Sequence, residues 1–283
     1  MMPMAGTPLD RVRWIHGAPD CAASTDPLLQ VHPFDADTFI IRQSKCSSFE
    51  GPFLYLFAGR RRIVLVDSGA APDRGGPPPP VRATVDKILE ERQRQHPRET
   101  TDLIVAHTHS HSDHIAGDSQ FAGRPRTTIV GRDLPSITSF YQLPQWPDGQ
   151  ATLDLGGRTL TILPLPGHHP SHIAIHDSRT HIVLTGDSLY PGLLTVRDVA
   201  AYRRSADRLA RFAATHPIAH VLGNHIEMQR TPRLLYPIGT TFQPDEHPLP
   251  LIPADLDEWR AACERLSSTP HQDVHDRFII EVL

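Results

Sequence analysis

The feature that most constrains the fold of this chain is a run of potential metal ligands that directly follows a short apolar segment. Residues Leu103–Ala106 predict a buried strand, and residues 108–114 then read Thr-His-Ser-His-Ser-Asp-His. Alternate residues of an extended segment point to the same side. His109 and His111 can therefore bind one ion together.

The last part of this run predicts a change of backbone geometry. Ser112 is suited to cap the start of a helix, because its hydroxyl can accept from free backbone N–H groups. Asp113 and His114 would then lie on a helical turn rather than on the extended segment. That change redirects their side chains and suits a second ion a few ångströms away.

Three later apolar segments also end in a polar residue that can bind a metal ion. His168 follows Gly167, Asp187 follows Gly186, and His225 comes two residues after Gly223. Loops at strand ends are where a rigid scaffold commonly places ligands in a shared cleft. A glycine before the ligand permits close backbone approach or a positive φ angle.

The hydrophobic pattern along the chain predicts strands interleaved with helices and hence a layered α/β protein. This alternation leaves open a doubly wound parallel sheet and a sandwich with outer helices. We expect one domain over residues 1–283, with an irregular N-terminal segment 1–50 and a C-terminal extension 226–283 that supplies a pocket wall and a helix. The expected strands are 53–57, 63–66, 103–106, 127–130, 151–155, 159–163, 172–176, 181–185, 220–222 and 278–283, and the expected helices are 81–95, 199–215 and 254–266.

Charge and cysteine content exclude several classes of protein. The net charge of −4 gives no general attraction to nucleic acid or to anionic lipid. No apolar run approaches the 18 residues of a membrane-spanning helix, and the N-terminus lacks a secretory signal pattern. Cys21, Cys46 and Cys263 are few and far apart, so we expect reduced thiols, no disulfide, no cysteine-based zinc site and a cytoplasmic protein.

The order of these motifs resembles the metallo-β-lactamase-fold superfamily of binuclear metallohydrolases. The chain presents H-x-H-x-D-H at 109–114, P-G-H at 166–168, G-D at 186–187 and G-x-H at 223–225. Asp67, in Leu-Val-Asp-Ser-Gly, matches an early aspartate of that family. The resemblance implies an αββα sandwich of two mixed sheets, with the metal site at one edge of the two sheets.

The resemblance also implies a ligand set and a cofactor. Two Zn²⁺ ions are expected, because nitrogen and carboxylate ligands without thiolate suit zinc, with iron or manganese as alternatives. Asp67 would orient the ligand loop through hydrogen bonds. By position, the first ion would take His109, His111 and His168, the second Asp113, His114 and His225, and Asp187 would bridge the two.

The chemistry expected of such a centre is hydrolysis, in which a bridging hydroxide attacks a carboxylic ester-like carbonyl. Asp113 would steer the hydroxide and pass a proton to the leaving group. Tyr190 stands three residues after Asp187, as in acyl-homoserine lactonases, where its hydroxyl can donate to the carbonyl oxygen. A lactone is therefore the leading substrate. True β-lactamases usually carry Cys or Ser at the position of Asp187.

Other functions stay open on the sequence alone. Within the hydrolases, the alternatives are a thioester or a β-lactam substrate. Outside them, they are a mononuclear iron dioxygenase and a non-catalytic metal-binding relative. The expected partner is a small-molecule substrate, with neither nucleic acid nor membrane, and exposed apolar loops allow a homodimer.

Some residues near the motifs are weaker candidates. His169 and His172 flank His168, and one of them could support the ligands or touch substrate. His107 should face away from the ligands. Glu227 is expected to be a solvated carboxylate rather than part of the cleft. The segments 10–37 and 226–253 are the expected pocket walls, by analogy with the fold.

Overall fold

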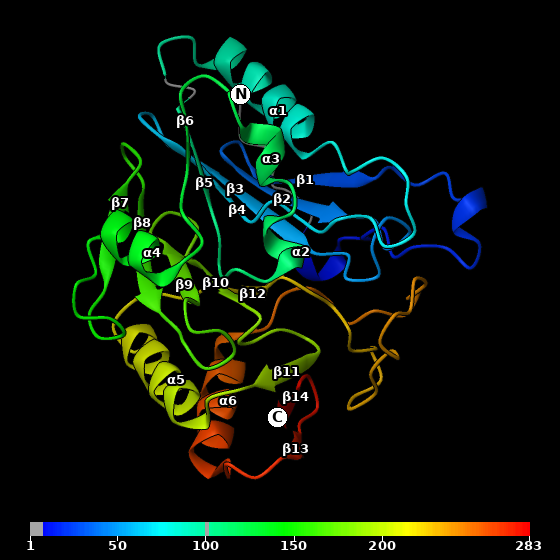
Figure 1. Cartoon of the computed structure of the whole chain (residues 1–283), viewed down its shortest axis with the longest axis vertical. Coiled ribbons are helices and arrows are strands. Elements are labelled where there is room, and N and C mark those ends of the chain that lie inside the picture. The colour runs from blue at the N-terminus through cyan, green and yellow to red at the C-terminus, as the bar shows by residue number, and fades with distance from the viewer. Residues whose placement is uncertain (1–7, 100–101) are drawn as a thin grey trace.

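The computed structural model describes residues 8–99 and 102–283, and its core is a pair of sheets packed face to face (Figure 1). The first sheet has six strands in sequence order, and the second has five in the order β12-β10-β9-β8-β7. The first contains β1 (Leu29–Asp35), β2 (Thr38–Gln43), β3 (Phe53–Ala58), β4 (Ile63–Val66), β5 (Leu103–Ala106) and β6 (Thr127–Ile129). The second contains β7 (Ala151–Asp154), β8 (Thr159–Pro164), β9 (Ile173–Asp177), β10 (Ile182–Gly186) and β12 (His220–Gly223).

Both sheets are mixed, as expected. Strand β4 pairs antiparallel with β3 and parallel with β5, while β10 pairs antiparallel with β9 and parallel with β12. A third sheet, which the sequence did not predict, has the order β11-β14-β13. Its strands are β11 (Leu193–Val196), β13 (His271–Val274) and β14 (Ile279–Val282).

The described residues form six helices, which lie among and outside these sheets. They are α1 (Val81–Gln95), α2 (Ser112–Ile115), α3 (Asp118–Phe121), α4 (Leu134–Tyr141), α5 (Val199–Ala213) and α6 (Pro253–Arg265), with short 3₁₀ turns at Leu9–Arg11 and Cys21–Ala23. Helix α1 contributes Val85 and Leu89 to an apolar cluster on the outer face of the first sheet. Helices α5 and α6 contribute Tyr202 and Trp259 to a cluster on the outer face of the second.

The alternation of side chains along the strands explains the layers. On β3, Phe53, Tyr55 and Phe57 point into the cluster between the two sheets, while Leu54 and Leu56 point toward α1. Successive residues of a strand face opposite sides, so a strand apolar at every position is buried on both. This is the αββα sandwich that the resemblance implied.

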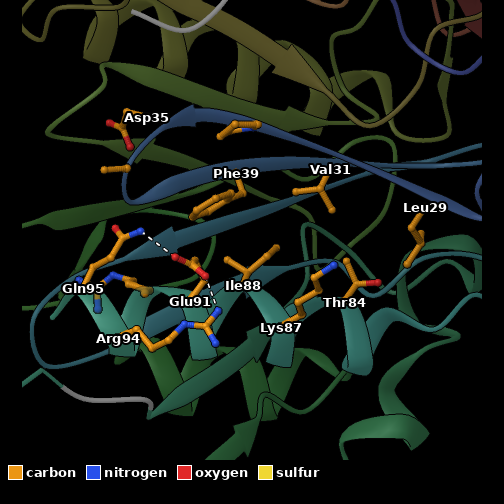
Figure 2. A pocket seen from close by; sticks show the side chains of 13 residues that line it. Leu29, Val31, Asp35, Phe39, Thr84, Lys87, Ile88, Glu91, Arg94 and Gln95 are labelled. Carbon is orange, nitrogen blue, oxygen red and sulfur yellow. Dashed lines mark hydrogen bonds and ion pairs between the residues drawn. The ribbon is translucent and has the colours of Figure 1, made fainter. Parts of the chain in front are cut away.

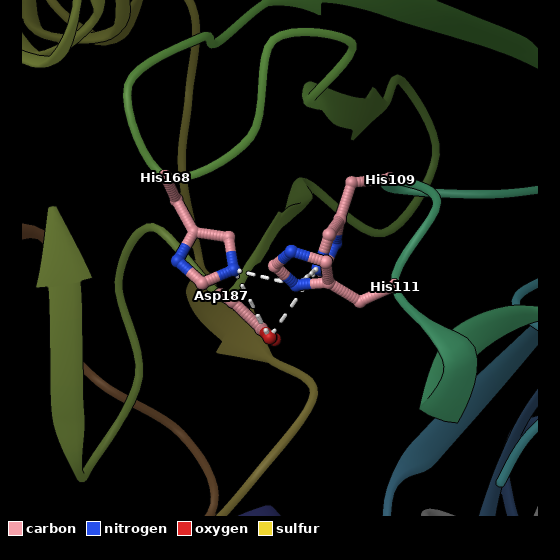
Figure 3. A group of neighbouring side chains, drawn as sticks. All are labelled: His109, His111, His168 and Asp187. Atoms are coloured by element: carbon pink, nitrogen blue, oxygen red, sulfur yellow. Dashed lines mark hydrogen bonds and ion pairs between the residues drawn. The ribbon is translucent and has the colours of Figure 1, made fainter. Parts of the chain in front are cut away.

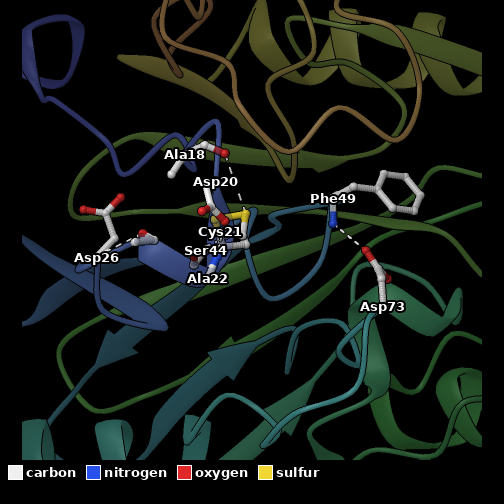
Figure 4. The surroundings of a disulfide bond; sticks show 10 residues. Ala18, Asp20, Cys21, Ala22, Asp26, Ser44, Phe49 and Asp73 are labelled. Atoms are coloured by element: carbon white, nitrogen blue, oxygen red, sulfur yellow. Dashed lines mark hydrogen bonds between the residues drawn. A yellow bond between two sulfur atoms is a disulfide. The ribbon is translucent and has the colours of Figure 1, made fainter.

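Two predictions about the N-terminal segment were wrong. Of the segment 1–50, residues 1–7 lie outside the described part, and residues 8–50 are not irregular throughout, because β1 and β2 form an antiparallel hairpin at the edge of the first sheet. Cys21 and Cys46 form a disulfide with Cα atoms 5.2 Å apart, although no disulfide was expected (Figure 4). The hairpin brings together the two cysteines, 25 residues apart in sequence. Cys263 is a buried free thiol.

The disulfide removes the reduced-thiol argument for the compartment, and the cytoplasmic location stays a prediction. Among the described residues, none of the helices has both the length and the apolar character needed to cross a membrane.

Candidate metal centre

All the predicted ligands lie where strands end at one edge of the two sheets. His109 and His111 follow β5, and Asp113 and His114 lie on α2. The remaining ligands come from the second sheet. His168 follows β8, Asp187 follows β10, and His225 follows β12. The two halves of the sandwich thus contribute to one site.

Glycines allow the close approach at two of these strand ends. Gly167 has φ +141°, and a Cβ there would lie 2.6 Å from the Cα of Tyr202. Gly186 has φ +52°, and a Cβ there would lie 2.4 Å from Nε2 of His172. A side chain at either position would collide with its neighbour and strain the backbone. The expectation for glycines before the ligands is confirmed at both.

The first group of ligands consists of His109, His111, His168 and Asp187, whose ligand atoms lie within 4.8 Å of one another (Figure 3). Nδ1 of His111 is 2.9 Å from Nε2 of His109 and 3.1 Å from Nε2 of His168. Oδ2 of Asp187 lies 3.5 Å from Nε2 of His109. Three ring nitrogens and a carboxylate oxygen therefore converge on one point.

The second group consists of Asp113, His114, Asp187 and His225, again within 4.8 Å. Oδ2 of Asp113 lies 3.1 Å from Nε2 of His114 and 3.2 Å from Nε2 of His225. Asp187 belongs to both groups: its Oδ2 is 3.3 Å from His114 and its Oδ1 is 3.4 Å from His225. It is placed as a bridging ligand would be.

The polar atoms of the centre fit metal ions better than they fit one another. Oδ1 of Asp187 is buried and has no hydrogen-bond partner among the described residues. Burial lowers the pKa of His109, with the nearby His114 adding to the effect, so its ring is held neutral as a ligand requires. Burial opposes the charged form of His225 too, but Asp187 and Asp113 outweigh it and raise its pKa to about 9. The carboxylates of the second group thus favour a cation.

A surrounding set of hydrogen bonds orients the ligand rings. His168 Nδ1 lies 2.9 Å from the carbonyl oxygen of Thr195, and His225 Nδ1 lies 3.1 Å from that of Glu50. Such contacts select the tautomer that presents Nε2 to the ion.

Asp67 holds the loop that carries the first ligands. It accepts hydrogen bonds from the backbone and hydroxyl of Thr108 at 2.8 and 3.0 Å and from Nδ2 of Asn224 at 2.7 Å. It also lies 3.3 Å from Nδ1 of His114. These contacts agree with the orienting role that the resemblance implied.

Of the weaker histidine candidates, two contact the predicted ligands and one does not. Nε2 of His172 accepts from the backbone N–H of Asp187 at 3.2 Å, and its ring stacks on that of His109. His169 packs its ring against His111. His107 turns away from the ligands and pairs with Asp118 at 2.8 Å, as expected.

Tyr190 borders the cavity beside the centre, and its ring packs edge-on against His225. Its hydroxyl lies 2.8 Å from the carbonyl oxygen of Leu193 and 3.1 Å from Oε2 of Glu227. Glu227 also accepts from the backbone N–H of Leu193 at 2.8 Å. Glu227 is therefore part of the cleft, and its interpretation as a solvated carboxylate was wrong.

The cavity at the centre has a volume of about 240 Å³. Residues of the segment 226–253, among them Tyr236 and Ile238, form one wall, as expected. The segment 10–37 does not line the cavity. The loop between β2 and β3 lines it instead, with Lys45, Phe49 and Glu50. No sequence motif had indicated these three residues.

A larger cavity of about 540 Å³ lies between the β1–β2 hairpin and α1 (Figure 2). Phe39 of β2 and Ile88 of α1 are among its apolar lining residues, and Lys87, Glu91 and Arg94 of α1 also line it. It contains none of the predicted ligands, so the smaller cavity is the one that belongs to the metal centre.

The fold and the paired ligand groups define a metal-centre protein of the αββα type. The sequence model of the Metallo-beta-lactamase superfamily matches residues 49–268, and the chain belongs to that superfamily.

Relatives with assigned activities are hydrolases. An acyl-coenzyme A thioesterase MBLAC2 from Gallus gallus is 24% identical over 250 residues, which cover 71% of this chain and 82% of that protein. A hydroxyacylglutathione hydrolase from Synechococcus sp. is 31% identical over 91 residues. That match covers 32% of this chain and only 36% of the Synechococcus protein.

Solved structures share the fold at low identity. A metallo-beta-lactamase from Erythrobacter litoralis has a TM-score of 0.53 at 16% identity, covering 86% of this chain and 99% of that one. A metallo-beta-lactamase from Pontibacter korlensis has a TM-score of 0.52 at 15% identity, covering 84% and 100%. At these identities the likeness concerns the fold alone.

Proposed function

We propose that this chain is a metal-dependent hydrolase of carboxylic thioesters or esters that uses two metal ions, with zinc as the expected metal. The observation that carries the proposal is the pair of ligand groups that share Asp187. The named relatives that hydrolyse thioesters favour a thioester among the candidate substrates.

When bound, two divalent cations supply Lewis-acid polarisation of a carbonyl and lower the pKa of a water molecule. The protein's own part is to position and to transfer protons. The side chain of Asp113 is 18% exposed and that of Asp187 only 10%, so Asp113 is the more open of the two carboxylates toward the cavity. Asp113 is therefore suited to take a proton from the attacking water and to return it to the leaving group.

A lactone is the second candidate, and Tyr190 is the observation that favours it. The ring of Tyr190 borders the cavity, but its hydroxyl is held by Leu193 and Glu227. To donate to a substrate oxygen, this hydroxyl must leave those partners. If it does, Tyr190→Phe should lower kcat for a lactone about tenfold or more and leave KM nearly unchanged.

The test is a hydrolysis panel on metal-loaded protein, with thioesters, lactones, aryl esters, β-lactams and phosphodiesters. We expect cleavage of thioesters first, and metal analysis should find two ions per chain. One iron per chain with oxygen consumption would overturn the proposal in favour of a mononuclear dioxygenase. Two bound ions without turnover of any panel member would favour a non-catalytic metal-binding relative.

A further inference from the structure

Lys45 is a buried cation in the wall of the cavity beside the metal centre. It follows β2 on the loop that leads to β3, and its side chain is almost fully buried. Its Nζ donates to the carbonyl oxygen of Phe49 at 2.9 Å. Within residues 8–99 and 102–283, no carboxylate comes within ion-pair distance of it.

The unused donors of Lys45 need an explanation. An ammonium group has three N–H donors, and burying it without a charged partner is costly. Three carboxylates, those of Glu246, Glu227 and Glu50, lie near enough to favour the charged form of Lys45 without pairing with it. Glu246 accepts hydrogen bonds from Nη1 and Nη2 of Arg42 at 2.5 and 2.6 Å, and Glu227 accepts from Tyr190 and Leu193. Glu50 lines the same cavity.

The backbone around Lys45 holds its side chain in place. Gly51 has φ +48°, and a Cβ there would lie 2.7 Å from Cγ of Lys45. Gly17 has φ +80°, and a Cβ there would lie 3.2 Å from Cβ of Lys45. The next residue, Cys46, is tied to Cys21 by the disulfide. Lys45 therefore sits in a preformed slot and does not depend on a ligand to order it.

The use of lysine here is unusual for this chain. Of its 28 basic residues only Lys45 and Lys87 are lysines, and Lys87 is exposed on α1. Burial, with Arg42 nearby, lowers the pKa of Lys45 to about 8, so the ammonium is still largely protonated at pH 7. A compact charge with free donors suits a carboxylate oxygen.

Building on the proposed function, we propose that Lys45 binds a carboxylate at the far end of the substrate's acyl group. The substrate is then a thioester or ester of a short dicarboxylic acid. The cavity of about 240 Å³ is smaller than pockets for drug-sized ligands, which fits a short acyl chain. Glu50 and Glu227 line the same cavity and repel a carboxylate that is placed away from Lys45.

The test compares two series of product acids on the metal-loaded protein by calorimetry. Malonate, succinate, glutarate and adipate carry a second carboxylate, whereas the monoacids from acetate to pentanoate have only the one that a metal centre could hold. For the best-fitting length, wild type should bind the diacid about tenfold or more tighter than its monoacid counterpart. Lys45→Met should remove this preference, and Lys87→Met, the matched control, should retain it.

A second measurement does not depend on the variant. With ¹⁵N-lysine, the chain gives two side-chain ammonium signals, because it has two lysines. The diacid should shift the Lys45 signal and leave the Lys87 signal in place. Equal binding of diacids and monoacids by wild type, or a Lys45 signal that no diacid moves, would overturn the inference.

Turnover of neutral and carboxylated acyl thioesters, measured beside these binding data, separates this inference from the proposed function. If the protein prefers diacids through Lys45 but cleaves no thioester or ester, only the proposed reaction is overturned. If it cleaves neutral and carboxylated acyl thioesters equally well, before and after Lys45→Met, only the role of Lys45 is overturned.

Discussion

At the scale of single residues, Asp187 is the central residue of the candidate site, because its carboxylate belongs to both groups of predicted ligands. It is buried, and its Oδ1 has no hydrogen-bond partner among the described residues. Each oxygen lies 3.3 to 3.4 Å from a histidine of the second group, and Oδ2 also lies near His109. No other side chain of the described part belongs to both groups.

Asp187→Ala is therefore expected to lower the metal content from two ions per chain to one or none, with loss of hydrolysis of at least 100-fold. His111→Ala should act similarly through the first group. Metal analysis and turnover of the best panel substrate measure both effects. His96→Ala, at an exposed histidine on the end of α1, is the control and should change neither. Full metal content in Asp187→Ala would contradict the bridging assignment.

The burial of Lys45 predicts a pH dependence of the free energy of unfolding. Its pKa is about 8 in the folded chain against 10.5 for a free lysine, so between these values the unfolded chain holds the extra proton. Stability should then rise with pH across this window. Below pH 8 the full cost of the buried charge, about 3 kcal/mol, is present. Lys45→Met removes it.

We expect the free energy of unfolding of Lys45→Met, relative to wild type, to fall by about 3 kcal/mol between pH 7 and pH 10.5. Urea denaturation of both proteins across this range, without reductant, measures the difference. A difference that does not change with pH would mean that Lys45 is not a buried charge. Lys87→Met should follow wild type throughout.

Secondary-structure elements show where sequence reasoning succeeds and fails. Strands such as β3 and β10 are buried at every position and mostly apolar, and the sequence predicted them within a residue or two. Strand β1 contains Pro33 and alternates half-buried and exposed residues, as an edge strand can, so it was missed. Helix α4 is only eight residues long and was missed too, although Asp133 caps it.

The ligands were predictable because each follows an apolar strand in a fixed motif. The positions of Lys45, Glu50 and Glu227 were not predictable, because these residues lie on loops whose course brings them to the cavity. The disulfide was missed for the same reason, because the pairing of Cys21 with Cys46 depends on how the β1–β2 hairpin folds.

The disulfide closes a loop that contains the whole β1–β2 hairpin. Its loss in Cys21→Ser/Cys46→Ser should lower the free energy of unfolding by about 3 kcal/mol, because the unfolded chain gains freedom. Urea denaturation with and without reductant checks this. Reductant should destabilise wild type by a similar amount and leave the double variant unchanged. Equal stability of all four samples would show that the disulfide does not form in solution.

At the scale of the whole molecule, the two groups of predicted ligands draw on both sheets. One sheet supplies the ligands that follow β5, and the other supplies those that follow β8, β10 and β12. Ions that bind only the folded chain stabilise it by about 4 kcal/mol when free metal is a thousand times its Kd. For a chain of this length, that amounts to a rise in Tm of about 10 °C.

Removal of metal by a chelator should therefore lower Tm by about 10 °C, and added zinc should restore it. Calorimetry or circular dichroism follows the transition. Asp187→Ala should respond much less to the chelator, which separates loss of bound metal from other effects of the reagent. A wild-type Tm that ignores the chelator would contradict a centre that joins the two sheets.

The order of the ligands along the chain has a consequence for biosynthesis. His109 to His114 leave the ribosome first, but the second group is incomplete until His225 has been added and β12 has joined β10. Since chains fold progressively as they are made, the second group of ligands is completed only late in synthesis. A nascent chain that stops short of β12 can present only the first group, so a complete second group marks a chain whose synthesis has passed that point.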